Sequence, residues 1–335
     1  MKAVQLRQFG IEHLHLTKLD TPEFGDNEVL VRTTAVALEY HDLLVVENLI
    51  PFGISLPHVP ATEAVGIVEE AGCKVTRWKK GDRVIIPFIP RWEAGHNTPH
   101  HDELRTGFSA PGVLAEFTVQ PENTLVRTPS NLTDAEAAPL SVGGLTVWAV
   151  LAEQANIRAG QTILVQGTGG VSLIALQIAK MFGLKVIATT SSKEKEQKLR
   201  TLGADEVINY TEHPEWSKEV KRLTGGIGVD VTLDVAGTAT IAQSILSVKK
   251  HGFVGLIGLL TGTQLNIDII PLITNYLRLQ SYSVGNAAQL TDFVQAIEKN
   301  NLKPVIDSVY PLDKVQNAFY RFKAGDVFGK IVIQF

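Results

Sequence analysis

A glycine turn between a strand and a helix is the most chemically informative pattern in this sequence. The apolar run 163–165 leads into Gly167, Gly169, Gly170 and Val171, and a helical pattern follows at once. Glycines let the chain turn tightly and approach a pyrophosphate, whose charge is met by free N–H groups at the start of the helix. The pattern therefore predicts a dinucleotide site at Gly167, Gly169, Gly170 and Val171.

The segments around this turn alternate between strands and helices. Apolar runs predict strands at 162–166, 185–189, 206–208, 229–235, 253–257 and 277–284, and helical patterns separate them at, for example, 193–202 and 240–248. Such alternation is typical of a doubly wound parallel sheet with helices on both faces.

The first part of the chain has a different rhythm. Short alternating runs at 3–6, 28–32, 66–69, 83–86 and 114–119 are separated by turn residues and predict a β-rich domain. Residues 87–112 form a long polar connection with no convincing element, and such loops are often functional lids. A helical stretch at 290–299 and a terminal strand at 329–333 predict a return to this domain. We therefore expect a β-rich domain over 1–126 and 286–335 and a nucleotide-binding domain over 127–285.

The composition is that of an ordinary globular protein. The 335 residues include 44% hydrophobic and 20% charged residues and carry a net charge of −4, enough apolar material for a large core in about two domains. Without a Lys/Arg run, binding to nucleic acid or an anionic membrane lacks its usual electrostatic drive. The N-terminal residues have no apolar signal core, and no apolar stretch is long enough to span a bilayer, so we expect a cytoplasmic location. Cys73 is the only cysteine, which excludes an internal disulfide.

The end of the second predicted strand bears on the choice of cofactor. In such sheets an acidic residue about twenty positions after the first glycine usually binds the adenosine ribose, but here that count reaches Ile187. Hydroxyl and ammonium groups follow instead, among them Ser191, Lys193 and Lys195. They suit a 2′-phosphate, so we expect NADP(H). The alternative is that these lysines only solvate the start of a helix.

Four segments in fixed order resemble the medium-chain dehydrogenase/reductase superfamily: 160–172, 202–210, 223–230 and 329–331. The resemblance covers essentially the whole chain and is closest to the zinc-independent branch that includes quinone oxidoreductases. It implies an α/β protein with a GroES-like, β-rich catalytic domain and a Rossmann domain with a doubly wound parallel sheet. It also implies an active-site cleft between the two domains and a homodimer joined through the Rossmann sheets.

Further cofactor contacts are implied by motif position in this resemblance. Near the adenosine phosphate they are Ser191, Lys195 and Tyr210; on the nicotinamide side they are Thr146, Ile257, Gly258, Val284 and Asn286; and Lys330 is expected to face the cleft.

The resemblance also marks where zinc-containing relatives carry their metal ligands. Those positions read Glu39, Thr62 and Gly144 here, and a hydroxyl or a hydrogen atom is not a normal zinc ligand. The segment 91–111 contains no cysteine, which excludes a four-cysteine structural zinc. We therefore expect no metal, although the histidines of residues 96–101 leave a metal role in the lid as an alternative.

Chemistry without a metal needs hydrogen-bond donors for a developing oxyanion. Tyr40 is the first candidate, because a phenol donates while neutral, and packing is its alternative role. A buried Glu39 would have a raised pKa and act as an acid, or would pair with His41 or Arg91. Asp42 is a third candidate, with a helix N-terminus as its alternative role.

These observations predict an NADPH-dependent oxidoreductase that transfers hydride to a quinone or an α,β-unsaturated carbonyl compound without a metal. Quinones and enones spread negative charge by conjugation, so a metal is less necessary. Two alternatives stay open: a zinc-independent alcohol dehydrogenase or aldehyde reductase, with His41 as a possible base, and a catalytically weak NADPH-binding redox sensor.

Overall fold

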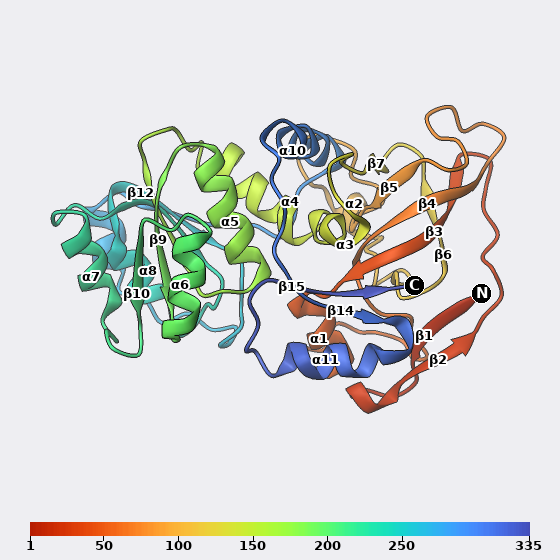
Figure 1. Ribbon diagram of the computed structural model, residues 1–335, viewed down its shortest axis with the longest axis horizontal. Helices are drawn as coiled ribbons and strands as arrows, with labels where there is room; N and C mark the ends of the chain where they lie inside the picture. Colours follow the sequence, from red (N-terminus) through yellow and green to blue (C-terminus); the bar gives the residue numbers. More distant parts are fainter. The chain divides into compact units, whose positions relative to one another are not determined.

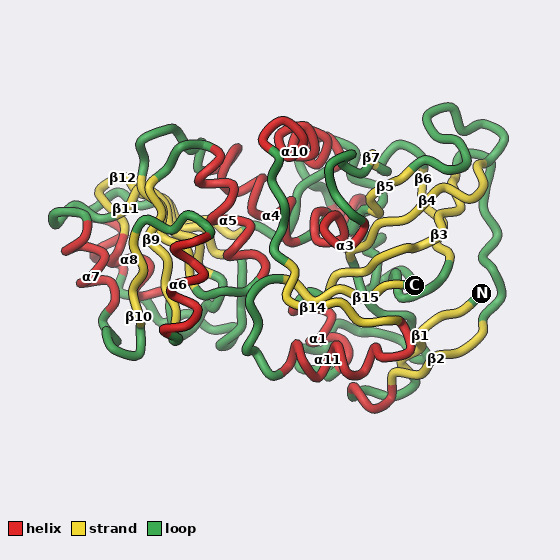
Figure 2. The backbone as a smooth tube through the Cα atoms, in the orientation of Figure 1, coloured by secondary structure: helices red, strands yellow, loops and turns green.

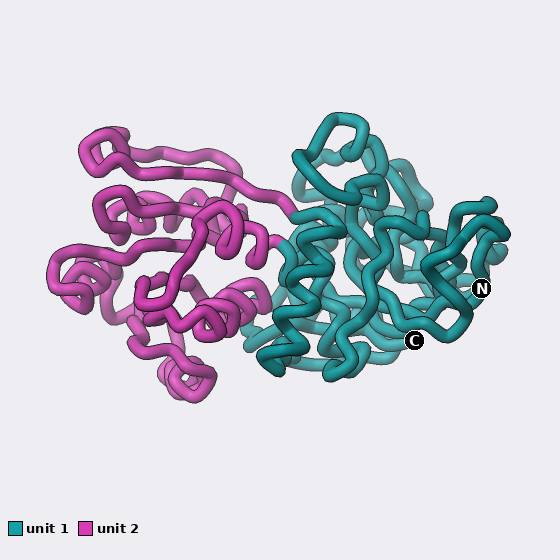
Figure 3. Tube along the Cα trace, turned by 90° about the horizontal axis from the view of Figure 1, so that it is seen from above, with its two compact units in different colours: residues 1–145, 285–335 teal, residues 146–284 magenta.

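The computed structural model describes residues 1–335, which divide into two compact units (Figure 3). Unit 1 comprises Met1–Leu145 and Gly285–Phe335, and unit 2 comprises Thr146–Val284. The predicted fold class is confirmed, because unit 1 is β-rich and unit 2 is a doubly wound parallel sheet. The first boundary lies later than the predicted 126/127, since the helical segment 134–140 packs against strands of unit 1.

Unit 1 is built on a seven-stranded sheet with strand order β14-β15-β3-β4-β5-β7, in which β6 also pairs with β3; β1 and β2 form a separate pair (Figure 1). The C-terminal segment of unit 1, Gly285–Phe335, joins this sheet where β15 pairs antiparallel with β3, with Val332 opposite Ala37. The strands are β1 (Lys2–Leu6), β2 (Leu14–Lys18), β3 (Glu28–Ala37), β4 (Glu63–Ala71), β5 (Arg83–Ile86), β6 (Phe117–Pro121), β7 (Val126–Arg127), β14 (Ile306–Pro311) and β15 (Lys330–Gln334).

The helices of unit 1 are short, apart from α10 and α11. They are η1 (Ile11–His13), α1 (Tyr40–Val46), α2 (Pro99–Asp102), α3 (Asp134–Ala137), η2 (Ala138–Leu140), α10 (Ala287–Asn300), η4 (Leu312–Lys314) and α11 (Val315–Lys323). Helix α11 packs on β14 and β15 through Val315, Ala318 and Phe319, which join the buried core of the sheet. Helix α4 (Gly143–Trp148) crosses the boundary and continues as the π-helical turn η3 (Ala149–Gln154).

Unit 2 is a six-stranded sheet of order β10-β9-β8-β11-β12-β13, with every neighbouring pair parallel. Figure 2 shows its strands in the middle of the unit with helices around them. The central strands are buried almost without interruption because helices cover both faces. The elements are β8 (Thr162–Gln166), α5 (Gly170–Met181), β9 (Lys185–Thr190), α6 (Lys193–Thr201), β10 (Glu206–Asn209), α7 (Trp216–Leu223), β11 (Val229–Asp234), α8 (Ile241–Ser247), β12 (Val248–Leu256), α9 (Ile269–Thr274) and β13 (Arg278–Ser281).

All six strands predicted for unit 2 exist. The connection 87–112, predicted to lack secondary structure, contains the one-turn helix α2, which begins with a proline after Thr98. Strands β2 and β14 and helix α11 have no counterpart among the elements predicted from the sequence. No single helix is long and apolar enough to cross a bilayer; the bent helix pair 134–140 and 143–154 passes that test of length and composition only when taken together.

Candidate active site

The predicted glycine turn joins β8 to the N-terminus of α5. Gly167 has a φ of 74°, a left-handed conformation that favours glycine. Gly169 is the N-cap of α5, no side chain caps the helix, and a Cβ on Gly167 or Gly169 would meet no atom within 4 Å. The backbone N–H groups of Gly170 and Val171 thus belong to an uncapped helix start, which is the chemistry a pyrophosphate requires.

A buried polar network lies directly beneath this turn. The Ser172 hydroxyl donates to the Gln166 carbonyl at 2.6 Å, and the Gln166 amide donates to the Ser244 hydroxyl at 2.6 Å. Ser244 in turn donates to Asp234 Oδ2 at 2.6 Å, while Asp234 Oδ1 accepts the N–H of Gly237 at 2.7 Å. The network therefore links the glycine turn after β8 to the loop after β11.

We expect Ser244→Ala to lower the free energy of unfolding by about 1–3 kcal/mol, because it leaves buried polar partners without a hydrogen bond. Urea unfolding followed by circular dichroism measures this change. Ser247→Ala is the matched control, since Ser247 is equally buried on α8 but only donates to the Gln243 carbonyl within the helix, at 2.8 Å. An equal loss for both variants would show that the network adds nothing beyond helix packing.

The other predicted cofactor residues of unit 2 gather at the carboxyl ends of its strands. Ser191 and Tyr210 follow the paired ends of β9 and β10, where Thr190 lies opposite Asn209. Lys195 lies in the first turn of α6, and its backbone N–H donates to the capping Ser192 hydroxyl at 3.3 Å. This edge is where ligands bind in open parallel sheets.

The residues predicted for the nicotinamide side divide between the two units. Ile257 and Gly258 follow β12, and a Cβ on Gly258 would lie only 1.8 Å from the Val235 carbonyl oxygen, so only glycine fits there. Thr146 and Val284 are buried in unit 2, where the Thr146 hydroxyl donates to the Ser283 carbonyl at 2.9 Å. Asn286 belongs to unit 1 instead. Its side chain caps α10 and donates to the Gly95 carbonyl at 3.2 Å, so its polar atoms are already engaged.

A buried ion cluster is the main polar feature of unit 1. The Lys330 ammonium, 3% exposed, contacts Glu39 Oε1 and lies 2.6 Å from Glu63 Oε1. Glu63 Oε2 accepts the backbone N–H groups of Val142 at 2.8 Å and Gly143 at 3.1 Å. A Cβ on Gly143 would lie 2.5 Å from Glu39 Oε1, so glycine is needed there. The cluster joins four segments distant in the sequence.

The two carboxyl groups of this cluster have opposite pKa shifts. Burial raises the pKa of Glu63 well above its usual value. The charge of Lys330 acts to lower this pKa, and the charge of Glu39 acts to raise it further. Burial also opposes ionisation of Glu39, but Lys330 and His41 hold the pKa of Glu39 below its usual value. The two carboxylates raise the pKa of Lys330 despite its burial. Lys330 thus favours the ionised form of both carboxyl groups, and burial outweighs this effect at Glu63 but not at Glu39.

This arrangement corrects two predictions. The pKa of Glu39 is lowered and not raised, and its main partner is Lys330, which was not expected. Of the two expected partners, His41 also lowers the pKa of Glu39, whereas Arg91 pairs with Glu103 at 2.8 Å. Lys330 was expected to face a cleft and contact the cofactor, but its ammonium is enclosed by two carboxylates within unit 1. A charge enclosed in this way is already compensated and has little left to offer a ligand.

Helix α1 places a second polar group beside this cluster. Asp42 is 1% exposed, and its Oδ2 accepts the Glu39 N–H at 2.8 Å, which is the helix N-terminal role that was held as the alternative to a catalytic one. Burial raises the pKa of Asp42 to about 7, although the Glu39 N–H opposes the shift. His41 Nε2 shares a hydrogen bond with the Thr62 hydroxyl at 2.6 Å. Burial lowers the pKa of His41 to about 4, so its imidazole is neutral near pH 7.

Tyr40, the first residue of α1, packs with its ring against the buried core of unit 1. This is the packing role that was held as the alternative to proton donation. The polar groups of this region come instead from the neighbouring residues Glu39, His41 and Asp42.

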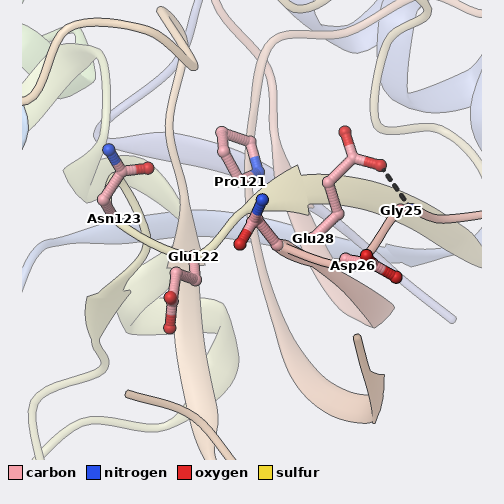
Figure 4. Close-up of a pocket in the computed structure, with 7 residues that line it drawn as sticks. Gly25, Asp26, Glu28, Pro121, Glu122 and Asn123 are labelled. Carbon is pink, nitrogen blue, oxygen red and sulfur yellow. Dashed lines mark hydrogen bonds between the residues drawn. The ribbon is translucent and has the colours of Figure 1, made fainter. Parts of the chain in front are cut away.

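A surface hollow of about 560 Å³ lies at the turn between β2 and β3 and beside β6 (Figure 4). Its carboxylates serve local structure: Glu28 accepts the Gly25 N–H at 2.7 Å, and Glu122 accepts the Thr76 N–H at 2.9 Å. Asp26 pairs with Lys74 at 2.9 Å and accepts from Cys73 at 3.2 Å, which raises the pKa of that thiol. The hollow therefore offers no uncommitted catalytic group.

Comparison with known proteins decides the family. The model of the alcohol dehydrogenase GroES-like domain matches residues 25–130, and the model described as zinc-binding dehydrogenase matches residues 170–299. A zinc-type alcohol dehydrogenase-like protein of Schizosaccharomyces pombe is 32% identical over 97% of this chain and 96% of its own length. The chain belongs to the medium-chain dehydrogenase/reductase superfamily. As such it is an oxidoreductase, and the superfamily uses nicotinamide cofactors.

Two further relatives of this medium-chain dehydrogenase/reductase differ in what their names describe. The crystal structure of a putative alcohol dehydrogenase from Sinorhizobium meliloti 1021 is 40% identical, covers 100% of this chain and 98% of its own, and superposes with a TM-score of 0.94. The human quinone oxidoreductase is 27% identical over 95% of this chain and 92% of its own length. The names of its relatives thus include both quinone oxidoreductase, which matches the first predicted activity, and alcohol dehydrogenase, which matches the first alternative.

The zinc named in the family description does not fit the residues of this medium-chain dehydrogenase/reductase. Glu39 is paired with Lys330, and Thr62 offers a hydroxyl that is bonded to His41. A Cβ on Gly144 would lie 2.8 Å from Phe293 Cε1, so that position has no room for a ligand. No group of three or more His, Cys, Asp or Glu side chains is arranged to hold a metal ion.

Sequence reasoning missed the ion pair between Glu63 and Lys330 and the network at Asp234 and Ser244. Both involve partners far apart in the chain. One local signal existed: Glu63 and Lys330 each stand immediately before an apolar run, 64–65 and 331–333, where an unpaired charge would be costly.

Proposed function

We propose that this protein transfers hydride from NADPH to quinones or α,β-unsaturated carbonyl compounds without a catalytic metal. The observation that supports this most is the ion cluster: Glu39, which stands at one of the metal-ligand positions of zinc-containing relatives, is committed to Lys330, as is the neighbouring Glu63. Conjugated acceptors spread the developing negative charge, so hydrogen bonds suffice to stabilise it. The 27% identity to the human quinone oxidoreductase is consistent with this acceptor class.

In this proposal the residues of the chain bind the cofactor and orient the acceptor. The uncapped N-terminus of α5 at Gly169, Gly170 and Val171 holds the pyrophosphate, and the hydroxyl and ammonium groups of Ser191 and Lys195 bind the 2′-phosphate. When bound, the nicotinamide cofactor supplies the hydride. The polar groups of unit 1 at α1 and β4 supply hydrogen bonds on the acceptor side.

We expect Lys195→Ala to weaken NADPH binding about 10- to 100-fold, the worth of a charge-assisted hydrogen bond, and to leave NADH binding nearly unchanged. Quenching of protein fluorescence by each cofactor gives the two dissociation constants. Lys198→Ala, one turn further along α6 in an ion pair with Glu194 at 2.6 Å, is the control and should affect neither. Equal losses for both cofactors would remove Lys195 as the 2′-phosphate ligand.

A second candidate function is reduction of simple aldehydes or oxidation of alcohols by the same metal-free site. It is favoured by the relatives from Schizosaccharomyces pombe and Sinorhizobium meliloti, whose names describe alcohol dehydrogenases. The third possibility, a redox sensor that binds NADPH without turnover, has no structural observation in its favour.

The deciding experiment follows NADPH absorbance with 1,4-naphthoquinone, 3-penten-2-one and butanal, each with and without EDTA. We expect chelator-insensitive oxidation with the quinone or the enone and little with butanal. Turnover of butanal alone would support the second candidate. EDTA-sensitive turnover accompanied by stoichiometric zinc in the protein would overturn the metal-free proposal.

We also propose a homodimer formed through unit 2, in the cytoplasm. Strand β13 is an edge of the six-stranded sheet, and the preceding helix α9 exposes Ile269, Ile270 and Ile273 at 60%, 62% and 66%. Isoleucines this exposed beside an open sheet edge are typical of an interaction surface. Light scattering from the full chain gives the mass that tests this.

A further inference from the structure

His41 is bonded to the protein through only one of its two ring nitrogens. Nε2 is bonded inward to the Thr62 hydroxyl at 2.6 Å and lies 3.5 Å from Asp42 Oδ1. Nδ1 has no partner in the protein, and the His41 side chain is 25% exposed. The imidazole therefore connects a buried polar group to solvent or to a bound molecule.

The buried end of this connection has a free acceptor. Asp42 Oδ1 is buried and receives no hydrogen bond, whereas Oδ2 is bonded to the Glu39 N–H. A buried carboxyl oxygen without a donor is costly when ionised but is satisfied when it carries a proton and donates it. The polar neighbours of this carboxyl group are the Thr62 hydroxyl and His41, whose Nε2 lies 3.5 Å from Oδ1.

Aromatic rings fix the orientation of His41. The imidazole is stacked on Phe88 with ring centroids 5.5 Å apart, and Phe108 meets it edge-on at 5.4 Å. Phe52 meets Phe108 edge-on at 5.0 Å and is 41% exposed. A planar apolar acceptor can pack against such rings, which also limit the access of water to the imidazole.

We propose that His41 is the catalytic proton donor of this enzyme and that Thr62 and Asp42 relay the proton to it from the interior. The proposal rests on the proposed reduction and goes beyond it by naming the source of the proton. His41 touches the acceptor, whereas Thr62 and Asp42 act through His41 and are positioning residues.

The atoms balance as follows. The hydride adds two electrons and one hydrogen to the conjugated acceptor, which becomes an enolate or hydroquinone anion. His41 Nδ1–H donates its proton to the anionic oxygen while Nε2 takes the proton of the Thr62 hydroxyl, which takes the proton of Asp42. The imidazole is neutral before and after the step, and Asp42 is left as a carboxylate. Water returns its proton along the same path after product release.

Chemical rescue separates this role from a structural one. We expect His41→Ala to lower kcat about 10²- to 10⁴-fold with NADPH and 3-penten-2-one or 1,4-naphthoquinone, whichever wild-type protein reduces faster. Added imidazole should restore kcat at least about tenfold by occupying the space between Phe88 and Phe108. The NADPH dissociation constant of this variant, measured by fluorescence, should be unchanged, because no cofactor residue is altered. His41→Ser, which leaves the same space, serves the same test if the alanine variant does not fold.

Three comparisons complete the test. Thr62→Ser should retain most of kcat and Thr62→Val should lose it, because only the former keeps the hydroxyl. His58→Ala is the control: His58 Nε2 is bonded to the Gly107 carbonyl at 3.0 Å, so kcat per folded molecule should not respond to imidazole. If wild-type protein reduces neither acceptor, the proposed function fails. If it reduces one and His41→Ala keeps kcat within about threefold, or loses it without imidazole rescue, only the inference on His41 fails.

Discussion

Replacement of Lys330 by methionine is expected to lower the free energy of unfolding by about 3–5 kcal/mol at pH 8, because it leaves Glu39 and Glu63 buried without their cation. Lys330 is 3% exposed, and Glu63 is fully buried. Each carboxyl group would then bind a proton to avoid its charge, so the loss should be smaller at pH 5 than at pH 8. Chemical unfolding at the two pH values measures both effects.

Two controls give this result its meaning. Glu39→Gln combined with Lys330→Met removes one charge of each sign, and we expect the double variant to recover about 0.5–3 kcal/mol relative to the sum of the single changes. Lys330→Arg keeps the charge and should cost less than methionine. A loss below about 1 kcal/mol for Lys330→Met, the value of an exposed ion pair, would mean that water reaches the cluster.

Replacement of Asp42 by asparagine should change how stability depends on pH. Burial raises the pKa of Asp42 to about 7 from its usual value of 3.8, so the folded state holds this proton more tightly than the unfolded state. The stability contributed by the bound proton is complete below about pH 4 and is lost as pH rises through 7. Relative to Asp42→Asn, wild-type protein should therefore lose about 3–4 kcal/mol between pH 4 and pH 8.

The measurement is the difference in free energy of unfolding between wild type and Asp42→Asn at pH 4, 6 and 8. Asp82→Asn provides a control of opposite sign. Burial opposes ionisation of Asp82, but the Lys79 N–H and ammonium hold the pKa of Asp82 below its usual value. The stability contributed by ionised Asp82 is complete above its usual pKa and is lost only as pH falls through the lowered pKa. A flat difference for Asp42 between pH 4 and pH 8 would contradict its raised pKa.

The sheet of unit 2 was predictable from the sequence because its information is local. Each strand, such as β8 or β9, is a short apolar run buried on both faces, and each is bounded by glycine or polar residues. The first domain boundary was less predictable. The segment 134–140 is helical, so from the sequence it resembles the alternating strands and helices of unit 2. It packs on the strands of unit 1 instead, and only tertiary contacts reveal this.

The phosphate-binding residues of unit 2 and the ion cluster of unit 1 also differ in how well the sequence predicts them. The glycine turn and the phosphate residues follow from strand ends and helix starts, which the sequence displays. The state of Glu39 does not, because its pKa depends on Lys330, 291 positions away, as well as on burial. Burial alone predicts a raised pKa for Glu39, and Lys330 reverses that direction, whereas the pKa of Glu63 stays raised.

The interleaving of the two units constrains how the chain can fold during synthesis. Unit 2 is one continuous segment and is complete once Val284 has been made. Unit 1 lacks β15 until residues 330–334 have been made. Until then β3 has an open edge, and Glu39 and Glu63 lack the ammonium group of Lys330. At about 5–20 residues per second, translation leaves that edge open for on the order of ten seconds or more after Ala37 has been made. The nascent N-terminal half is thus the part of this protein most in need of a chaperone.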